Sequence, residues 1–498
     1  MNRAANHTIL SPFRAGLILG VTTIFGAALR LHQLSAKSFW IDEGASVSFA
    51  TIPLRPFLYT LWSYQGNMAL YYFLLRAWIH FGDSEFVVRS LSVLFAVLTI
   101  PAIYFLGKRL FDRTTGLTAA VLLSVHSFHM QWSQEARGCS LLTLLLVLAA
   151  YFLICAMESK EESLGYWIAF TVTAALSFYA HIFAVFVLVT FAVSIAFPKP
   201  YRVRTRTIVI VAILFEHLIA PMALFVLLQH GGSQLAWLHR PSFDDISEFL
   251  LLLTSQSGVL LVVIYFSLAG MAFVRPVGVG QSDSDKEKWA LRLLLLWLVL
   301  PPLITLAASP VKPLFSPRYM LLCVPALVLL AARGLTHLYR LPVARRWVGA
   351  AAVVLMVTLS CWGTHEYFVN FAAENTDWRS AVNYILENQQ PGDGVVIYTS
   401  QALCYRYYAD HAERQHKVTT TPDVLYPSDP RRPINHYEVT SDTAGRERVW
   451  LLLHGEKDRP DELAVLQSTL GERFQPQEMI TFPGKIWITV VLYVRTPL

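Results

Sequence analysis

Residues 15–43 read AGLILGVTTIFGAALRLHQLSAKSFWIDE, so an apolar run is followed closely by two adjacent carboxylates, Asp42 and Glu43. The run is about twenty residues long, enough for one helix to span a bilayer. Two neighbouring carboxylates at a membrane face are costly unless they perform chemistry or bind a cation. Trp40 suits an interfacial position, because its ring can keep one apolar and one hydrated side. The stretch predicts an active site at a membrane surface.

The whole chain has the composition of a membrane protein. Of its 498 residues, 55% are hydrophobic and 15% are charged, which excludes an ordinary soluble globule. The net charge of +6 is small for this length, and the basic residues form short clusters between apolar runs, so we expect no nucleic-acid partner. The five cysteines are odd in number and lack metal-ligand spacing, so we expect neither a disulfide framework nor structural zinc.

Apolar segments recur along the first 365 residues. They predict a polytopic α-helical membrane protein with about eleven transmembrane helices. The segments lie near 15–34, 86–107, 114–131, 140–157, 164–181, 182–198, 207–229, 247–274, 289–308, 318–338 and 346–364. The first suits a cleaved signal or an uncleaved anchor, and we expect the anchor, because no good small-residue cleavage site precedes the polar loop.

Basic residues are concentrated in alternate loops, which sets the expected orientation. This distribution of basic residues predicts a multi-pass protein of the plasma (inner) membrane with its N-terminus in the cytoplasm. The same orientation puts five polar residues at the outer ends of their helices. They are Asp42, Glu135, Arg137, His181 and Arg318.

The composition divides the chain into two expected domains. Residues 1–365 form the transmembrane domain, with a long first outer loop at 35–84 in which residues 70–80 suit an amphipathic surface helix. Residues 366–498 have a soluble composition and predict a small extracytoplasmic α/β domain. Its expected helix covers 378–387, and its expected strands cover 394–398, 448–453 and 485–494.

Each candidate residue also has a plain structural interpretation. The Asp42-Glu43 pair suits a solvated acidic turn as well as a catalytic or cation-binding site. Glu135 and Arg137 suit a charge pair at a helix start. His181 lies within a long apolar run and suits a packed residue, while Arg318 suits a snorkelling anchor as well as a phosphate ligand.

Several stretches together resemble the polyprenyl-phosphate-sugar-dependent membrane glycosyltransferases of the GT-C fold. Within that group, the chain is most similar to the bacterial relatives of protein O-mannosyltransferases and lipid A aminoarabinose transferases. The matching stretches are Arg30 through Glu43, Leu70-Tyr71-Tyr72, Gly82 through Ser92, Gln134-Glu135-Ala136-Arg137 and Ser316-Pro317-Arg318-Tyr319. One departure is Asn67-Met68-Ala69, where the family commonly has His-Pro-Pro before the Leu-Tyr-Tyr.

The resemblance implies a role for each candidate. Asp42 would be the catalytic base that deprotonates the acceptor hydroxyl, and Glu43 would shape the acceptor site or hold a cation. Arg137 and Arg318 would bind the donor phosphate. Glu135 resembles the second acidic position, and with His181 we assign it to the acceptor or cation site.

The expected reaction is transfer of a sugar from a polyprenyl-phosphate-linked donor to a lipid, glycan or protein of the cell envelope. A single displacement would invert the anomeric centre. The sequence specifies no cofactor and leaves a divalent cation open. The alternative is a transporter or flippase of a lipid-linked sugar, although such proteins usually have repeated halves, which this sequence lacks.

Overall fold

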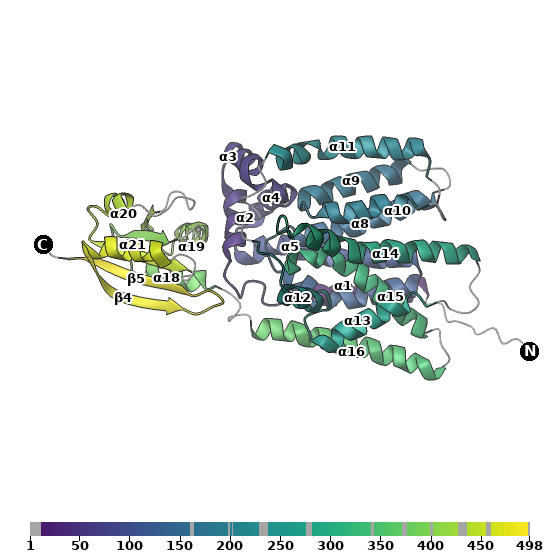
Figure 1. Cartoon of the computed structure of the whole chain (residues 1–498). Coiled ribbons are helices and arrows are strands. Elements are labelled where there is room, and N and C mark those ends of the chain that lie inside the picture. Colours follow the sequence, from purple (N-terminus) through teal and green to yellow (C-terminus); the bar gives the residue numbers. More distant parts are fainter. Residues whose placement is uncertain are drawn as a thin grey trace, which may run out of the picture. The chain divides into compact units, whose positions relative to one another are not determined.

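The computed structural model describes residues 11–159, 164–197, 200–201, 203–228, 238–274, 281–339, 343–370, 376–398, 402–426, 436–454 and 460–496. Contacts divide the chain into two compact units (Figure 1). The membrane unit comprises Met1–His32, Pro53–His80 and Arg89–Tyr367. The C-terminal unit comprises Gln33–Ile52, Phe81–Val88 and Phe368–Leu498. Two short pieces of the N-terminal region therefore fold with the C-terminal region.

The membrane unit is a bundle of helices. Over the described residues, seven helical segments are long and apolar enough to cross a membrane. They are α1 (Pro12–Leu31), α5 (Glu85–Leu110), α8 (Cys139–Glu158), α11 (Thr205–Leu228), α14 (Gln281–Ala308), α16 (Val343–Val369), and η5 (Pro317–Cys323) continued by α15 (Val324–Tyr339). Three shorter apolar helices are α9 (Leu164–Ala180), α10 (Ala184–Ile195) and α13 (Val259–Met271). The prediction of a polytopic helical membrane protein is confirmed.

The span predicted at 114–131 is two helices, α6 (Arg113–Ser124) and α7 (Ser127–Ser133). A fully buried arginine of α1 explains the break. The guanidinium of Arg30 donates to the carbonyl oxygens of Leu123 and Ser124, at 3.1 and 2.8 Å. These are the last carbonyls of α6, which a continuing helix would have paired with its own N–H groups. A tertiary contact therefore ends a helix that the apolar pattern alone would extend.

The span predicted at 247–274 is also interrupted, between α12 (Phe243–Leu253) and α13. Ser255, Gln256 and Gly258 between them have φ values of 71°, 56° and 84°. Residues in this left-handed region do not continue a right-handed helix. By contrast, the predicted break near His181 is present between α9 and α10.

The part of the first loop that belongs to the membrane unit is helical. It forms α3 (Leu54–Thr60), the π-helix η1 (Leu61–Gln65), the 3-10 helix η2 (Gly66–Met68) and α4 (Ala69–Trp78), before η3 (Ile79–Phe81). The predicted amphipathic helix is thus α4. It buries Tyr71, Tyr72 and Leu75 and exposes Phe73, so one face of α4 packs against the protein.

The C-terminal unit contains a five-stranded sheet of order β2-β1-β3-β5-β4. The strands are β1 (Gly394–Tyr398), β2 (Asp423–Tyr426), β3 (Arg448–His454), β4 (Phe474–Phe482) and β5 (Ile488–Arg495). Strands β2, β1 and β3 are parallel to one another. Strand β5 is antiparallel to β3, and β4 is antiparallel to β5. β2 and β4 were not predicted, because β2 is very short and β4 is mostly exposed and polar. The sheet confirms the small α/β domain.

Helices of the C-terminal unit cover both faces of its sheet. These are α18 (Trp378–Asn388) on one face and α20 (His436–Asp442) and α21 (Pro460–Gly471) on the other, while α19 (Ala402–Arg414) packs against α18 and α2 (Ile41–Thr51). Alternate residues of β3 point to opposite faces. Leu451 packs with Val439 of α20 and Leu466 of α21. On the other face, the rings of Trp450 and Tyr384 of α18 have centroids 6.1 Å apart.

Candidate active site

Three of the residues singled out from the sequence meet in the membrane unit. Arg137 and Arg318 both lie close enough to His181 to act on it electrostatically. The His181 ring centroid is 5.2 Å from that of Tyr319, and the Arg318 guanidinium carbon is 5.2 Å from the centre of the same ring. We call Arg137, His181, Arg318 and Tyr319 the arginine cluster. Two guanidinium groups near one imidazole make this region suited to an anion.

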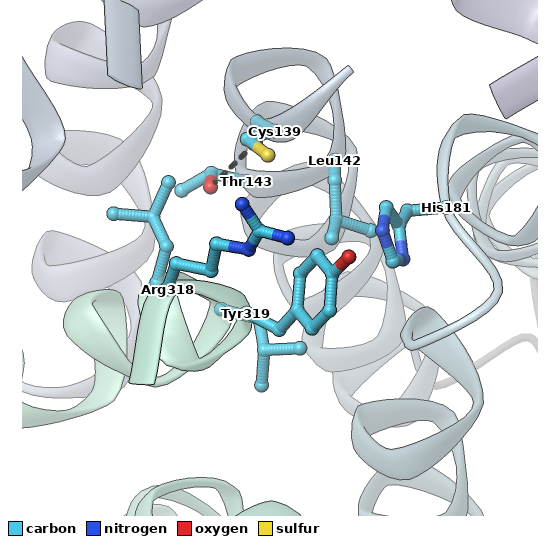
Figure 2. A pocket seen from close by; sticks show the side chains of 8 residues that line it. Cys139, Leu142, Thr143, His181, Arg318 and Tyr319 are labelled. Carbon is cyan, nitrogen blue, oxygen red and sulfur yellow. Dashed lines mark hydrogen bonds between the residues drawn. The ribbon is translucent and has the colours of Figure 1, made fainter. Parts of the chain in front are cut away.

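Three members of the cluster, His181, Arg318 and Tyr319, line a small pocket, and Figure 2 shows the side chains that line it. Arg318 extends toward Cys139 and Thr143 at the start of α8, while the Tyr319 hydroxyl points toward His181. The lining residues are Cys139, Leu142, Thr143, His181, Arg318, Tyr319, Leu321 and Leu322. A cationic group beside an apolar wall suits a ligand with a charged head and an apolar tail.

The turn that carries Glu135 and Arg137 is fixed by several contacts. The Gln134 amide donates to the carbonyl oxygens of Arg30 and His32, at 3.0 and 2.7 Å. The Arg137 guanidinium donates to the Tyr72 hydroxyl at 3.3 Å. Glu135 is buried, at 8% exposed, in the same turn. These contacts bring the Glu135 and Arg137 turn, the end of α1 and the start of α4 together.

Gly138 allows this turn to approach the turn that holds His181. A Cβ at Gly138 would lie 2.8 Å from the carbonyl oxygen of Ala180, which is closer than real Cβ atoms come to backbone. The glycine is therefore required by the close approach of two chain segments.

Asn67 supports the other side of the His181 turn. Its side-chain oxygen accepts a hydrogen bond from the Ile182 N–H at 3.0 Å, and the His181 Nδ1 accepts one from the Phe183 N–H at 3.1 Å. An imidazole that accepts at Nδ1 carries its proton at Nε2. Asn67 is one of the residues at which the sequence departs from the family pattern, and here it holds the loop that presents His181.

The acidic pair lies in the C-terminal unit, in the first turn of α2. The carbonyl oxygen of Trp40 accepts from the N–H groups of Glu43 and Gly44, at 3.0 and 2.9 Å, and so starts the helix. Carboxylates in a first helical turn are favoured by the helix dipole, by about 0.3–1 kcal/mol. Asp42 is half-buried, whereas Glu43 is fully buried. A fully buried carboxylate does not fit the interpretation of a solvated acidic turn.

Cys404 of α19 lies against this turn. A Cβ at Gly44 would be 2.7 Å from the Cys404 sulfur, so only glycine leaves room for it. Burial, together with the nearby carboxylates of Glu43 and Asp42, raises the pKa of the Cys404 thiol. The thiol therefore stays protonated and serves as a small packing group, not as a nucleophile.

Two further residues, Glu216 and His217, lie on the exposed surface of α11, where His217 Nδ1 donates to the Ile213 carbonyl oxygen at 2.7 Å. They take no part in the arginine cluster. Within the part of the chain that the structure describes, no three His, Cys, Asp or Glu side chains converge as a metal site.

Comparisons with known proteins agree with this architecture. Residues 68–225 match the family described as dolichyl-phosphate-mannose-protein mannosyltransferase. No curated protein sequence matches the chain significantly.

Two solved structures are similar over nearly the whole chain. ArnT from Cupriavidus metallidurans bound to undecaprenyl phosphate is 11% identical, covers 96% of this chain and 97% of its own, and has a TM-score of 0.59. The oligosaccharyltransferase AglB from Archaeoglobus fulgidus, in complex with an inhibitory peptide and a dolichol phosphate, is 12% identical, covers 93% of this chain and 73% of its own, and has a TM-score of 0.55. The chain therefore has the GT-C fold.

Proposed function

We propose that this chain, a membrane glycosyltransferase of the GT-C type, transfers a sugar from a polyprenyl-phosphate-linked donor to an acceptor in the cell envelope. The observation that carries the proposal is the arginine cluster, in which Arg137 and Arg318 both lie near His181, and Arg318 and His181 line a pocket with apolar walls. The bound undecaprenyl phosphate and dolichol phosphate in the two similar structures support a donor of this chemical class.

In the proposed reaction, Asp42 accepts the proton of the acceptor hydroxyl. The freed oxygen forms a bond to the anomeric carbon of the sugar, and the bond from that carbon to the phosphate oxygen breaks. The polyprenyl phosphate leaves with the electron pair, and Arg137 and Arg318 stabilise its charge. One displacement of this kind inverts the anomeric centre. General-base assistance of this type contributes about 10²- to 10⁴-fold.

The remaining acidic residues and His181 bind the acceptor or the donor. We assign the acceptor or cation site to Glu135 and His181, and Glu43 shapes the acceptor site or holds a cation. His181, with its ring proton at Nε2, offers a hydrogen bond to an oxygen of the acceptor or the phosphate. The donor itself brings both the sugar and its leaving group, so the reaction needs no nucleotide-binding loop.

The test uses the purified full chain in lipid vesicles, with undecaprenyl phosphate linked to mannose, glucose or 4-amino-4-deoxyarabinose, and an envelope extract as acceptor. Release of free undecaprenyl phosphate together with a glycosylated product supports transfer. A flippase would move the donor across the vesicle while leaving the sugar-phosphate bond intact. Comparing envelope lipids, glycans and proteins by mass spectrometry with and without the gene then identifies the sugar and the acceptor.

We also propose that the protein lies in the plasma membrane, with the N-terminus in the cytoplasm and the C-terminal unit outside. The charge distribution of the loops supports this orientation. Met479 on β4 is 72% exposed and offers a labelling site. An impermeant thiol reagent applied to intact cells should label Met479→Cys protein and not Arg204→Cys protein. Labelling of Arg204→Cys protein alone would show that the orientation is the opposite of the one proposed.

A further inference from the structure

The stretch that carries Asp42 is held by side chains from the far end of the sequence. Residues Cys404, Tyr407, Tyr408 and His411 recur on one face of α19 with the spacing of helical turns. This face contacts two pieces of the N-terminal half that belong to the same unit, residues 33–52 and 81–88. The C-terminal unit therefore contains its own supports for α2.

The central contact is the Tyr408 hydroxyl. It accepts a hydrogen bond from the Phe39 N–H at 2.6 Å and donates one to the Glu85 carboxylate. Phe39 lies three residues before Asp42, and its side chain is fully buried, with its ring centroid 4.7 Å from that of Tyr407. Burial and the neighbouring Glu85 carboxylate raise the pKa of the Tyr408 hydroxyl, so it remains a donor.

Arg379 of α18 completes the support. Its guanidinium forms an ion pair with Glu85 and donates to the Ser35 carbonyl oxygen at 2.8 Å. The Ser38 hydroxyl donates to the carbonyl oxygen of Thr376 at 2.6 Å. The backbone before α2 is thus fixed at Ser35, Ser38 and Phe39. We call Tyr408, Glu85 and Arg379 the Tyr408 clamp.

Asp83 fixes the second N-terminal piece, residues 81–88, to α19. Its carboxylate pairs with Arg414 at 2.6 Å and with His411 at 3.3 Å. Its carbonyl oxygen accepts from the Tyr407 hydroxyl at 2.8 Å. Because Glu85 is two residues further along, these contacts also hold the carboxylate of the Tyr408 clamp in place.

On these contacts we propose that the C-terminal unit positions the catalytic base, with Tyr408, Glu85 and Arg379 as positioning residues that set the orientation of the first turn of α2. This inference rests on the proposed role of Asp42. A catalytic group must be held closely, since a displacement of about 1 Å can cost about a hundredfold in rate. The C-terminal unit would then contribute to the chemical step.

The test compares two tyrosine-to-phenylalanine variants on the same helix. Tyr408→Phe removes the hydroxyl that joins Phe39 to Glu85. Tyr405→Phe removes an equally buried hydroxyl that has no hydrogen-bond partner among the residues the structure describes, and it serves as the matched control. Each purified full-length variant is studied by hydrogen–deuterium exchange over residues 38–47 and by transfer kinetics with the donor panel named above.

For Tyr408→Phe we expect faster exchange in residues 38–47, a kcat lower by about ten- to a hundredfold, and a donor KM within about threefold of the unmodified protein. Tyr405→Phe should change neither exchange nor kcat. Unchanged exchange in Tyr408→Phe would refute the clamp. Faster exchange with an unchanged kcat would refute its role in positioning, and an equal loss of activity in both variants would indicate a general effect on folding.

A second pair of variants tests the same idea through packing. Gly44→Ala places a methyl group against the Cys404 sulfur and should shift α2, with a fall in kcat. Combining it with Cys404→Ala removes the obstructing sulfur and should restore most of that loss. Failure of the double variant to recover would contradict the positioning proposal.

The two proposals can be separated. If Asp42→Asn retains full activity, Asp42 is not the base and the proposed mechanism fails, while hydrogen exchange still reports whether the Tyr408 clamp holds α2. If Asp42→Asn is inactive and Tyr408→Phe behaves like Tyr405→Phe, only the positioning inference fails.

Discussion

The arginine cluster and the first turn of α2 are built in different ways. The cluster is assembled by turns between membrane helices, with Asn67, Gly138 and Gln134 fixing the backbone around it. The acidic turn is held by polar side chains of α18 and α19 in the C-terminal unit. The difference suggests that donor binding and base positioning depend on separate sets of supporting residues, so they should be separable by mutation.

The largest effect is expected for Asp42→Asn. The amide keeps the shape of the side chain but cannot accept the proton of the acceptor, so kcat should fall by at least about a hundredfold. Binding of undecaprenyl phosphate, measured by protection against thermal unfolding, should be unchanged because the arginine cluster is intact. Loss of lipid binding in this variant would contradict the proposed separation of donor binding from base positioning.

The next largest effect is expected for Arg318→Ala, which removes a charged donor from the arginine cluster. Hydrogen bonds to charged groups contribute about 1.5–3 kcal/mol, so the donor KM should rise by roughly ten- to a hundredfold, with some loss of kcat from the poorer leaving group. Arg318→Lys keeps the charge but loses the two-pronged contact and should recover only part of the activity. Equal activity of the lysine variant would favour a snorkelling anchor, and Arg137 would become the leading phosphate ligand.

A smaller effect, again on the cluster side, is expected for Asn67→Ala. Without the side-chain oxygen, the Ile182 N–H loses its partner and the His181 turn is less well fixed. We expect the donor KM to rise by about three- to tenfold, which corresponds to the roughly 0.5–1.5 kcal/mol of one net hydrogen bond. Asn67→Asp retains an acceptor at this position and is the matched control. A fall in kcat with an unchanged donor KM would indicate that Asn67 affects the chemical step and not donor binding.

The smallest effect concerns Cys404, whose thiol should not react with alkylating reagents in the folded protein. Burial and the carboxylates of Glu43 and Asp42 raise the pKa of its thiol, so the unreactive protonated form persists at pH 8. Mass spectrometry after brief alkylation should find Cys404 unmodified in the unaltered protein and modified after denaturation. Faster alkylation in Tyr408→Phe protein would show that the clamp also closes α2 onto α19.

The candidate residues themselves were visible in the sequence, but their surroundings were not. Asp42, Arg137 and Arg318 stand out because they are charged residues beside apolar runs, in stretches that resemble the motifs of the family. Glu85 lies in a stretch that resembled the family, yet only the structure gives it Tyr408 and Arg379 as partners. Tyr408 had no sequence signal beyond the helical spacing of aromatic residues in α19.

The sequence by itself determined the membrane class, most of the apolar helices and the small C-terminal α/β domain, because these follow from hydrophobic content and local periodicity. Tertiary structure alone decided where α6 ends, since the fully buried Arg30 takes the carbonyl oxygens of that helix. It also decided that α2 folds with the C-terminal unit, through a hydrogen bond between Phe39 and Tyr408, which are 369 positions apart. Such contacts depend on which side chains meet in three dimensions, and local sequence patterns carry no record of distant partners.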